Sequence, residues 1–280
     1  MKGWKRKSGT PSACRPISSV FHRHRVLALW AVCCWAAWGA GIIAGTAWGG
    51  QPPPVQMPDP GAVLEKLRNL PPPLPWEAQG ILIVQAPGEY YRMEFRLLAK
   101  GPEAVRLELY DPFGRPAYYL TVFQGRVTAV APGDKKPLPL NPALLAATLT
   151  GETGFSLEET LGILWGRIPL KTDRREGASV VPDTPPAYLQ LIFPGDLSQT
   201  IRISTDPFRI VGGGFKKKGS PGAVQISFAD FTELSGAFWP KEIKVRDEAT
   251  EKQVNLFFGQ IIPRSDFPEE AFQLSDSGRH

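Results

Sequence analysis

The chain has 280 residues, of which 32 are Lys or Arg and 27 are Asp or Glu, for a formal charge of +5. The charge is uneven: residues 1–50 hold seven basic and no acidic side chains, so the remaining body has 25 basic and 27 acidic residues and a charge of −2. All three cysteines and two of the three histidines also lie within residues 1–50, and the body has only the terminal His280. These counts exclude a cysteine nucleophile, a Cys/His metal site, a disulfide framework and a histidine base in the body, and they give no support for nucleic-acid binding.

Residues 26–50 form an uncharged run of 25 residues that directly follows a basic stretch ending at Arg25. Basic residues, an apolar run and small residues near a cleavage point are typical of an export signal, and we expect cleavage after Ala47, so that residues 1–47 are removed. The run is also long enough to remain as an uncleaved membrane anchor. A third alternative is lipidation at Cys33 or Cys34, although the residues before both cysteines fit a lipoprotein signal poorly. Each alternative places the body outside the cytoplasm.

Composition divides the rest of the chain into a proline-rich tether, one β domain and a C-terminal tail, at residues 48–60, 61–275 and 276–280. Asp59 and Pro60 are suited to begin a short helix as its N-cap and first residue. Three prolines, Pro71–Pro73, end that helix.

Alternation of apolar and polar residues predicts a mainly β, antiparallel sheet with one wet and one apolar face. About eleven strands follow from the pattern, at residues 81–84, 91–98, 105–110, 118–123, 126–131, 187–193, 200–204, 208–211, 223–228, 242–246 and 253–262. Two short central helices, at residues 142–149 and 156–165, are the expected lid over the apolar face. Residues 171–186 are expected to be a polar connector.

Three glycines, Gly212–Gly214, precede three lysines, Lys216–Lys218, and so suggest a phosphate-binding loop. The stretch lacks the phosphate-loop motif and no helix follows it. We therefore expect a solvated hairpin loop, whose lysines are able to meet an anionic membrane surface.

Acidic side chains give no sign of catalysis. The pairs Glu158-Glu159 and Glu269-Glu270 are adjacent in sequence and fit helix N-termini better than a shared substrate. Because no His or Cys partner is present, we expect no enzymatic activity, no metal and no cofactor.

Periodicity leaves open whether the apolar face packs as a filled core or encloses a cavity. A filled core would suit a structural or interaction module of the cell envelope. A cavity would instead take an apolar ligand such as an acyl chain.

Four stretches of the body occur in a familiar order. Residues 64–70 followed by 76–80 resemble a leading helix and a W-x-x-x-G strand opening, and residues 91–97 with 105–114 resemble an F-x-W and L-x-L-x-x-P-x-G strand pair. Residues 154–170 resemble a P-L-x-x-L-x-x-W-L-x-G-x-P segment, and residues 253–262 end a strand meander. In this order and spacing the body resembles the lipoprotein-localisation (Lol) carrier and receptor family of the bacterial periplasm, with the outer-membrane receptor branch closer.

The resemblance implies an incomplete antiparallel β-barrel of about eleven strands with a helical lid over an apolar cavity. It implies a monomer that binds acylated lipoproteins or lipid acyl chains, transfers them across the periplasm towards the outer membrane and works without covalent chemistry. The expected partners are therefore acylated lipoproteins or lipids and a membrane surface, with no nucleic acid. The expected cavity-lining residues are Met93, Phe95, Leu97, Leu107, Leu109, Leu120, Val122, Leu145, Leu161, Leu164 and Trp165.

In the receptor branch an apolar residue protrudes from the P-x-G turn, and the matching position here is Phe113. An exposed aromatic ring on a tight turn is unfavourable in water, so Phe113 is expected to be a wedge that touches a membrane or a partner. The alternative is that its ring folds back into the core. The chain departs from the receptor branch in lacking a good lipidation signal, so its membrane attachment stays open.

Overall fold

The computed structural model describes residues 57–71, 74–131, 137–150, 153, 155–170, 178–183 and 188–274. The predicted export segment, most of the tether and the predicted C-terminal tail lie outside these residues and stay predictions. The described residues all belong to one compact unit, residues 54–280. Among the helices of this part of the chain, none is long and apolar enough to cross a membrane.

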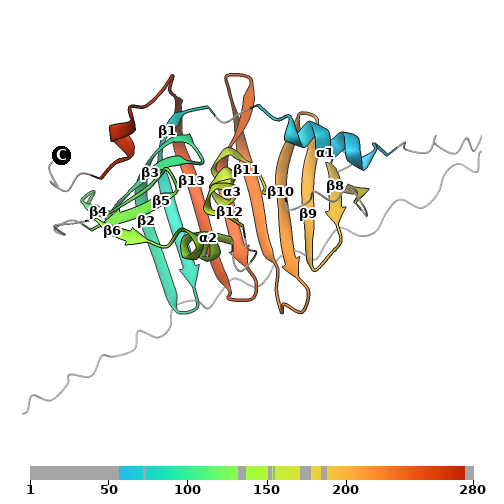
Figure 1. Ribbon diagram of the computed structural model, residues 1–280, viewed down its shortest axis with the longest axis horizontal. Coiled ribbons are helices and arrows are strands. Elements are labelled where there is room, and N and C mark those ends of the chain that lie inside the picture. The colour runs from blue at the N-terminus through green and yellow to red at the C-terminus, as the bar shows by residue number, and fades with distance from the viewer. Residues whose placement is uncertain are drawn as a thin grey trace, which may run out of the picture. The chain divides into compact units, whose positions relative to one another are not determined.

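Thirteen strands of the described residues form a single antiparallel sheet (Figure 1). They are β1 (Trp76–Ala86), β2 (Glu89–Gly101), β3 (Ala104–Tyr110), β4 (Pro116–Phe123), β5 (Arg126–Val130), β6 (Leu138–Leu140), β7 (Ser179–Asp183), β8 (Tyr188–Phe193), β9 (Leu197–Thr205), β10 (Phe208–Lys217), β11 (Val224–Leu234), β12 (Ala237–Asp247) and β13 (Lys252–Pro263). The order across the sheet is β6-β5-β4-β3-β2-β1-β13-β12-β11-β10-β9-β8-β7, so β6 and β7 are its two edges. The predicted incomplete antiparallel barrel is confirmed.

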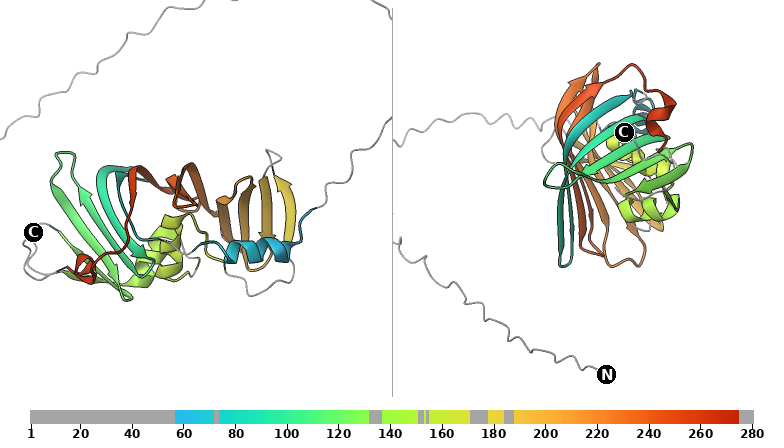
Figure 2. Two further views of the ribbon diagram at one scale, coloured as in Figure 1. Left: turned by 90° about the horizontal axis from the view of Figure 1, so that it is seen from above. Right: turned by 90° about the vertical axis from the view of Figure 1, so that its left-hand side faces the viewer.

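Helices cover the concave side of this curved sheet (Figure 2). They are α1 (Pro60–Arg68), α2 (Pro142–Thr150), α3 (Leu157–Leu161) and the 3₁₀ helix η1 (Gly162–Trp165). Asp59 caps α1 by accepting a 3.0 Å hydrogen bond from the Ala62 amide, and Ser156 forms a capping box with Glu159 at the start of α3. Both predicted helix starts are therefore confirmed.

Two edge strands, β6 and β7, were not expected from the alternation pattern. Each contains a proline, Pro139 in β6 and Pro182 in β7. Proline cannot donate a ladder hydrogen bond, so it weakens the sequence signal of a strand and is tolerated at a sheet edge. Part of the predicted polar connector is thus the strand β7.

The three glycines Gly212–Gly214 lie inside β10, so the predicted solvated loop is wrong there. A methyl group on Gly212 would approach the Ile226 carbonyl oxygen to 2.7 Å, and one on Gly213 would approach the Ile168 side chain to 2.7 Å. On Gly213 a methyl group would also meet the Thr200 backbone carbonyl, so only glycine lets both neighbouring strands, β9 and β11, come this close. Because glycines carry no side chain, they do not contribute to the alternation of apolar and polar residues from which the strands were predicted.

Charged residues and the C-terminal segment cover part of the convex face. Glu77 pairs with Arg96 at 2.8 Å and with Arg264 at 2.6 Å, and Glu108 pairs with Arg106 at 2.9 Å. Burial works to raise the pKa of Glu77, but hydrogen bonds from Arg264 and Arg96 outweigh it, and the pKa lies below its ordinary value. The 3₁₀ helix η2 (Glu269–Phe272) then places Phe272, only 1 % exposed, against this face.

Candidate apolar ligand site

The half of the concave face formed by β8–β12 is filled. The side chains in its middle are almost completely excluded from solvent, with exposures of 0–3 % at Leu191, Ile201, Ile203, Ile226 and Ile243. Apolar side chains towards the strand ends, such as Leu197 and Phe208, are half-buried. The helix α1 lies over this half (Figure 2) and buries Val63, Leu64 and Leu67. The middle of this half is therefore an ordinary hydrophobic core, while a pocket lies at the strand ends that contain Leu197, Phe215 and Val224.

Three tryptophans and a phenylalanine mark the middle of the concave face. The ring of Trp76 makes edge contacts with Trp165, Trp239 and Phe258 at centroid distances of 5.8, 5.9 and 5.6 Å. These rings join strands β1, β12 and β13 to η1 of the lid, so the lid rests on a fixed aromatic base.

The other half of the concave face, formed by β2–β6, is different. The strand register places Leu97, Leu107, Leu120, Ala129 and Leu138 in one row across five strands. Along this row the side chains change from buried at Leu97, through half-buried at Leu107 and Leu120, to 57 % exposed at Leu138. The apolar face therefore continues past the part of the sheet that the helices cover.

A neighbouring row shows the same change. Phe95 pairs with Leu109, and Leu109 pairs with Tyr118, in adjacent strands. Phe95 is buried, Leu109 is half-buried and Tyr118 is 55 % exposed. With the half-buried Met93 and the exposed Tyr91 on the same face of β2, these residues line an uncovered apolar surface that we call the open trough, made of Tyr91, Met93, Leu109, Tyr118, Leu120 and Leu138.

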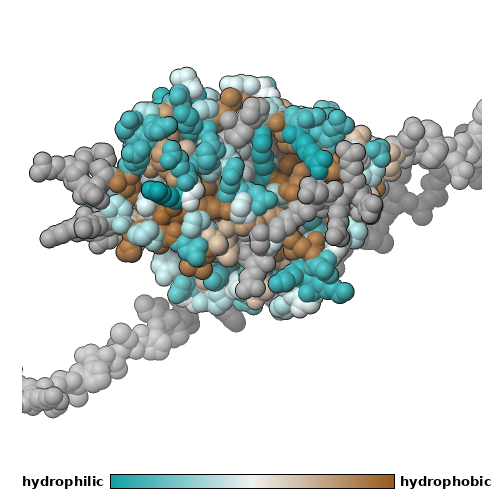
Figure 3. All heavy atoms as spheres, in the orientation of Figure 1, coloured by the Kyte–Doolittle hydropathy of each residue, from teal (hydrophilic) through white to brown (hydrophobic). Residues whose placement is uncertain are grey.

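Hydrophobic residues are visible at the molecular surface over the region where β2–β6 and α2 lie, among hydrophilic residues, and others are visible on the half near α1 (Figure 3). The continuity of the apolar surface on β2–β6 follows from the strand register. Contiguous apolar surface of this kind is uncommon on a soluble protein unless it meets a ligand, a partner or a membrane. The helix α2 follows β6 in the chain, contacts β12 and exposes Leu144 by 67 %.

All eleven predicted lining residues belong to the concave-side hydrophobic cluster. Five of them are buried within it, namely Phe95, Leu97, Val122, Leu161 and Trp165. Six are only partly buried against it, namely Met93, Leu107, Leu109, Leu120, Leu145 and Leu164. Sequence reasoning did not single out Tyr91, Tyr118 and Leu138 as lining residues of the trough; the alternation at Tyr91 and the apolar strand at Tyr118 were the available signals.

The lid is attached firmly at one end. Trp165 donates a 3.3 Å hydrogen bond from its indole to the Leu74 carbonyl, and Arg167 donates to the carbonyl groups of Leu70 and Pro71. The buried Gln199 on β9 donates a 2.5 Å bond to the Pro169 carbonyl. This attached end lies next to the filled half of the concave face.

At its other end the lid relies mainly on packing. The side-chain hydrogen bonds seen at α2 in the described residues remain within the lid: Asn141 caps the Ala143 amide at 2.9 Å, and Thr150 donates to the Ala146 carbonyl at 2.9 Å. Apolar packing is non-directional, so it restrains α2 less specifically than the side-chain hydrogen bonds restrain the attached end.

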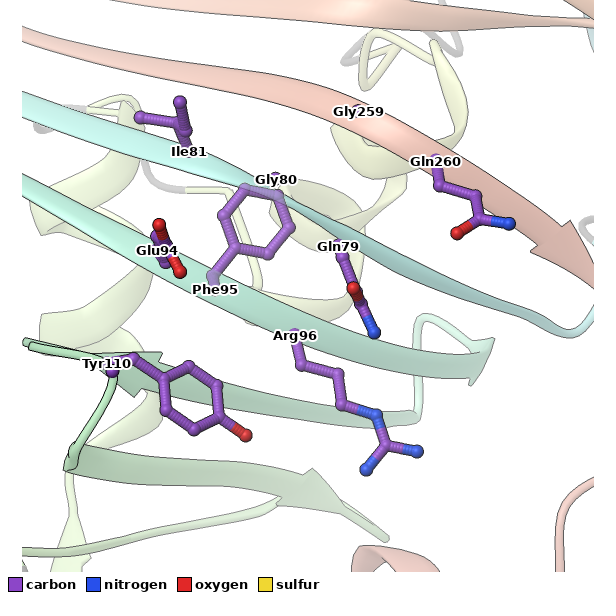
Figure 4. A pocket seen from close by; sticks show the side chains of 10 residues that line it. Gln79, Gly80, Ile81, Glu94, Phe95, Arg96, Tyr110, Gly259 and Gln260 are labelled. Atoms are coloured by element: carbon purple, nitrogen blue, oxygen red, sulfur yellow. The ribbon is translucent and has the colours of Figure 1, made fainter.

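A pocket of about 500 Å³ lies on the opposite, convex face (Figure 4). Its lining includes Gln79, Glu94, Arg96, Tyr110 and Gln260. Burial, followed by a 2.7 Å hydrogen bond to Glu108, raises the pKa of Tyr110 to about 12. Since Arg96 and Tyr110 are already bonded to carboxylates, this polar hollow offers little to an acyl chain.

The turn at Phe113 points its ring into solvent, with the side chain 82 % exposed. Asp111 holds the turn by accepting 2.9 Å hydrogen bonds from the amides of both Phe113 and Arg115. The hydrogen bond from the Arg115 side chain is the main reason that the pKa of Asp111 is lowered. The folded-back alternative for Phe113 is therefore wrong, while its role as a wedge stays a prediction.

Neither family models nor curated protein sequences match this chain. Solved structures do match. The LolA superfamily protein of Nitrosomonas europaea is 14% identical with a TM-score of 0.51, over 78% of this chain and 99% of that one. A putative outer membrane lipoprotein-sorting protein domain of Vibrio parahaemolyticus is 10% identical with a TM-score of 0.50, over 75% of this chain and 94% of that one.

A DUF1329 family protein of Desulfovibrio piger matches equally well, at 10% identity and a TM-score of 0.51, over 76% of this chain and 95% of that one. The matched proteins are covered almost completely, so the similarity extends over their whole fold. The resemblance to the Lol family is thus confirmed at the level of the fold, and the chain folds as the LolA superfamily and lipoprotein-sorting proteins do.

Proposed function

We propose that this protein binds the acyl chains of lipoproteins or lipids on its concave face and carries them across the bacterial periplasm towards the outer membrane, without enzymatic chemistry. The observation that carries the proposal is the open trough, where the apolar concave face runs out from under its lid between β2 and β6. The matched structures named as lipoprotein-sorting proteins support the same reading.

Burial of methylene groups would supply the binding energy. Each methylene contributes roughly 0.8 kcal/mol, so a chain that covers a few trough side chains binds strongly yet reversibly. Movement of α2, the packed end of the lid, would extend the trough over the half-buried residues beside it. Release needs only another apolar surface, since no covalent bond forms.

Localisation follows from the same proposal. Export by the N-terminal segment would place the domain in the periplasm, either soluble after cleavage near Ala47 or tethered by that segment. The exposed ring of Phe113 would touch the acceptor membrane or a partner during transfer. The intact mass of the exported protein distinguishes cleavage, retention and lipidation at Cys33 or Cys34.

Capture of an acylated lipoprotein tests the proposal. Native mass spectrometry of protein purified from a lipoprotein-producing bacterium is expected to show bound acyl species, and an unacylated form of the same lipoprotein is not expected to be captured. Met93→Asn and Leu120→Asn each place an amide in the trough and are expected to weaken capture about tenfold or more.

Tyr90→Asn is the matched control, because Tyr90 is 59 % exposed on the same strand as Met93 but lies on the opposite face. Capture that survives both trough variants, or that Tyr90→Asn weakens equally, contradicts the proposal.

The alternative of an envelope interaction module draws support from the filled half of the concave face. It predicts stable protein partners and no bound acyl species. Pull-down of a stoichiometric protein partner by lipid-free protein, with both trough variants still bound, would favour it.

A further inference from the structure

A pocket of about 640 Å³ lies where the β10–β11 and β12–β13 turns face α2. Residues of α2, of strands β9–β11 and of both turns line it. The volume is within the range of small-molecule sites, which is roughly 300–1,000 Å³. It is separate from the open trough, with which it shares no residue.

The inner part of the pocket is apolar. Phe215 is 2 % exposed and Val224 is 7 % exposed, and both belong to the hydrophobic core of the concave face. The helix α2 contributes Leu144 and Ala147 to the pocket while Ala146, between them and the core, is buried. An apolar chain entering here would thus lie against the core and the packed end of the lid.

The rim of the pocket is cationic. Lys217, Lys218 and Lys252 line it, and none of the three pairs with a carboxylate of the described residues. Of the other described lysines, Lys100 pairs with Asp266 at 2.8 Å and Lys241 with Asp230 at 3.3 Å, whereas Lys66, Lys216 and Lys244 pair with no described carboxylate. What distinguishes Lys217, Lys218 and Lys252 is that all three line one pocket. Three unpaired ammonium groups around one hollow repel each other and favour an anion between them.

The acidic residue among the described lining residues is Asp247, and its carboxylate serves its own turn. It accepts a 3.0 Å hydrogen bond from the Ala249 amide and a 2.7 Å bond from the Thr250 hydroxyl. Both carboxylate oxygens are thereby engaged within the β12–β13 turn. The carboxylate keeps its negative charge, so Asp247 and the lysine rim (Lys217, Lys218 and Lys252) together give the described lining a net charge of +2.

We propose that this pocket binds a single-chain amphiphile with an anionic head group. The acyl chain would pack on Leu197, Phe215 and Val224, and the lysine rim would bind the carboxylate or phosphate of the head. The inference rests on the proposed function, because it assumes that the concave face receives acyl chains. It adds that the protein binds acidic amphiphiles in preference to neutral ones at this pocket.

Two lysolipids of equal chain length test the selection: anionic lysophosphatidylglycerol and zwitterionic lysophosphatidylcholine, both below their micelle concentration. The full exported chain is expected to bind the anionic lysolipid about tenfold more tightly, and high salt is expected to reduce the difference. Replacing the lysine rim with Lys217→Gln, Lys218→Gln and Lys252→Gln is expected to remove the preference and to leave lysophosphatidylcholine binding unchanged.

A second triple variant is the control, with Lys100→Gln, Lys241→Gln and Lys244→Gln. It lowers the net charge equally at positions outside the pocket and is expected to keep the preference. All six lysines lie at the surface or partly so, and thermal unfolding of both variants checks that they fold.

Several results would overturn the inference. Equal affinity of the wild type for both lysolipids, or an unchanged preference in the lysine-rim variant, removes the anion site while the proposed function stands. Displacement of the lysolipid by millimolar inorganic phosphate would indicate that the site binds a free anion instead.

Binding to phosphatidylglycerol vesicles that depends on the lysine rim, without binding of single lysolipids, would indicate that the rim contacts a membrane surface. Failure of the wild type to bind either lysolipid or a lipoprotein acyl chain counts against the proposed function itself.

Discussion

The two halves of the concave face are built from similar alternating strands, but their apolar side chains differ in solvent exposure. Across the middle of β8–β12 the apolar side chains are almost completely buried beneath α1 and the attached end of the lid. Across β2–β6 the same kind of side chain runs from buried to more than half exposed within one row. The strands do not make this difference; the segments that cover them do.

This contrast settles how a filled core and a ligand surface are able to exist on one sheet. The buried middle of β8–β12 and the buried side chains of β2–β5, such as Phe95 and Val105, stabilise the sheet. The half-exposed residues towards β6 contribute less to the core. A half-covered apolar surface is a cost to the free protein in water, and a bound acyl chain would relieve that cost.

The largest expected effect is on the free energy of unfolding, when one apolar side chain is truncated in each half of the concave face. Ile243→Ala removes a side chain that is 1 % exposed in the filled half, and we expect a loss of about 2–5 kcal/mol in the free energy of unfolding. Leu120→Ala in the half-buried row should lose only about 1 kcal/mol. Urea unfolding of both variants measures the difference, and equal losses would break the comparison.

Removal of one lid attachment should have an intermediate effect. Gln199→Met keeps the volume but leaves the Pro169 carbonyl without its 2.5 Å donor, and we expect a loss of about 1–3 kcal/mol. Proteolysis near residues 165–170 should become faster while acyl capture at the trough persists. Asn141→Ala, at the packed end, is the control, and it should leave proteolysis at 165–170 unchanged.

Acid should weaken the sheet through its convex face. The folded-state pKa of Glu77 lies below its ordinary value of 4.5, because bonds from Arg264 and Arg96 outweigh burial. Its carboxylate therefore stabilises the fold above pH 4.5, and that contribution is lost as the pH falls through the lowered value. Urea midpoints measured from pH 7 to pH 3 should fall for the wild type and fall less steeply for Glu77→Gln. Parallel curves would show that Glu77 is not responsible.

Phe113 should have the smallest effect on stability. Its ring is 82 % exposed, so Phe113→Ser should change the free energy of unfolding by less than about 0.5 kcal/mol. Acyl capture should also be retained, because the trough is intact. Transfer of a captured lipoprotein to acceptor vesicles should slow, and an unchanged transfer rate would argue against the wedge.

Much of the fold could be predicted from the sequence because strand alternation and helix caps are local signals. Ser156 and Glu159 predicted the start of α3, and the alternation in residues 91–98 predicted the concave face of β2 correctly. The edge strands β6 and β7 were missed because three to five residues with a proline carry too weak a pattern. The glycine stretch of β10 was missed because its requirement for close approach arises between distant segments.

For the candidate site, the sequence predicts which face of the sheet is apolar but not which residues on that face are exposed. The eleven predicted residues do share the concave-side cluster, yet nothing in the alternation distinguishes buried Phe95 from half-buried Met93 two positions earlier. That distinction depends on α1 and the lid, which are far away in sequence, and on where their coverage stops. Leu138 escaped notice for the same reason, since its row is set by the register of β5 and β6.

Photo-crosslinking with a lipoprotein whose acyl chain carries a diazirine tests the central claim most directly. If the open trough holds the chain, mass spectrometry should locate cross-links in residues 107–126, which contain Leu109, Tyr118 and Leu120. Leu120→Asn should greatly reduce them, whereas Tyr90→Asn should not. Cross-links confined to residues 188–205 of the filled half, or none in the presence of captured lipoprotein, would contradict the account.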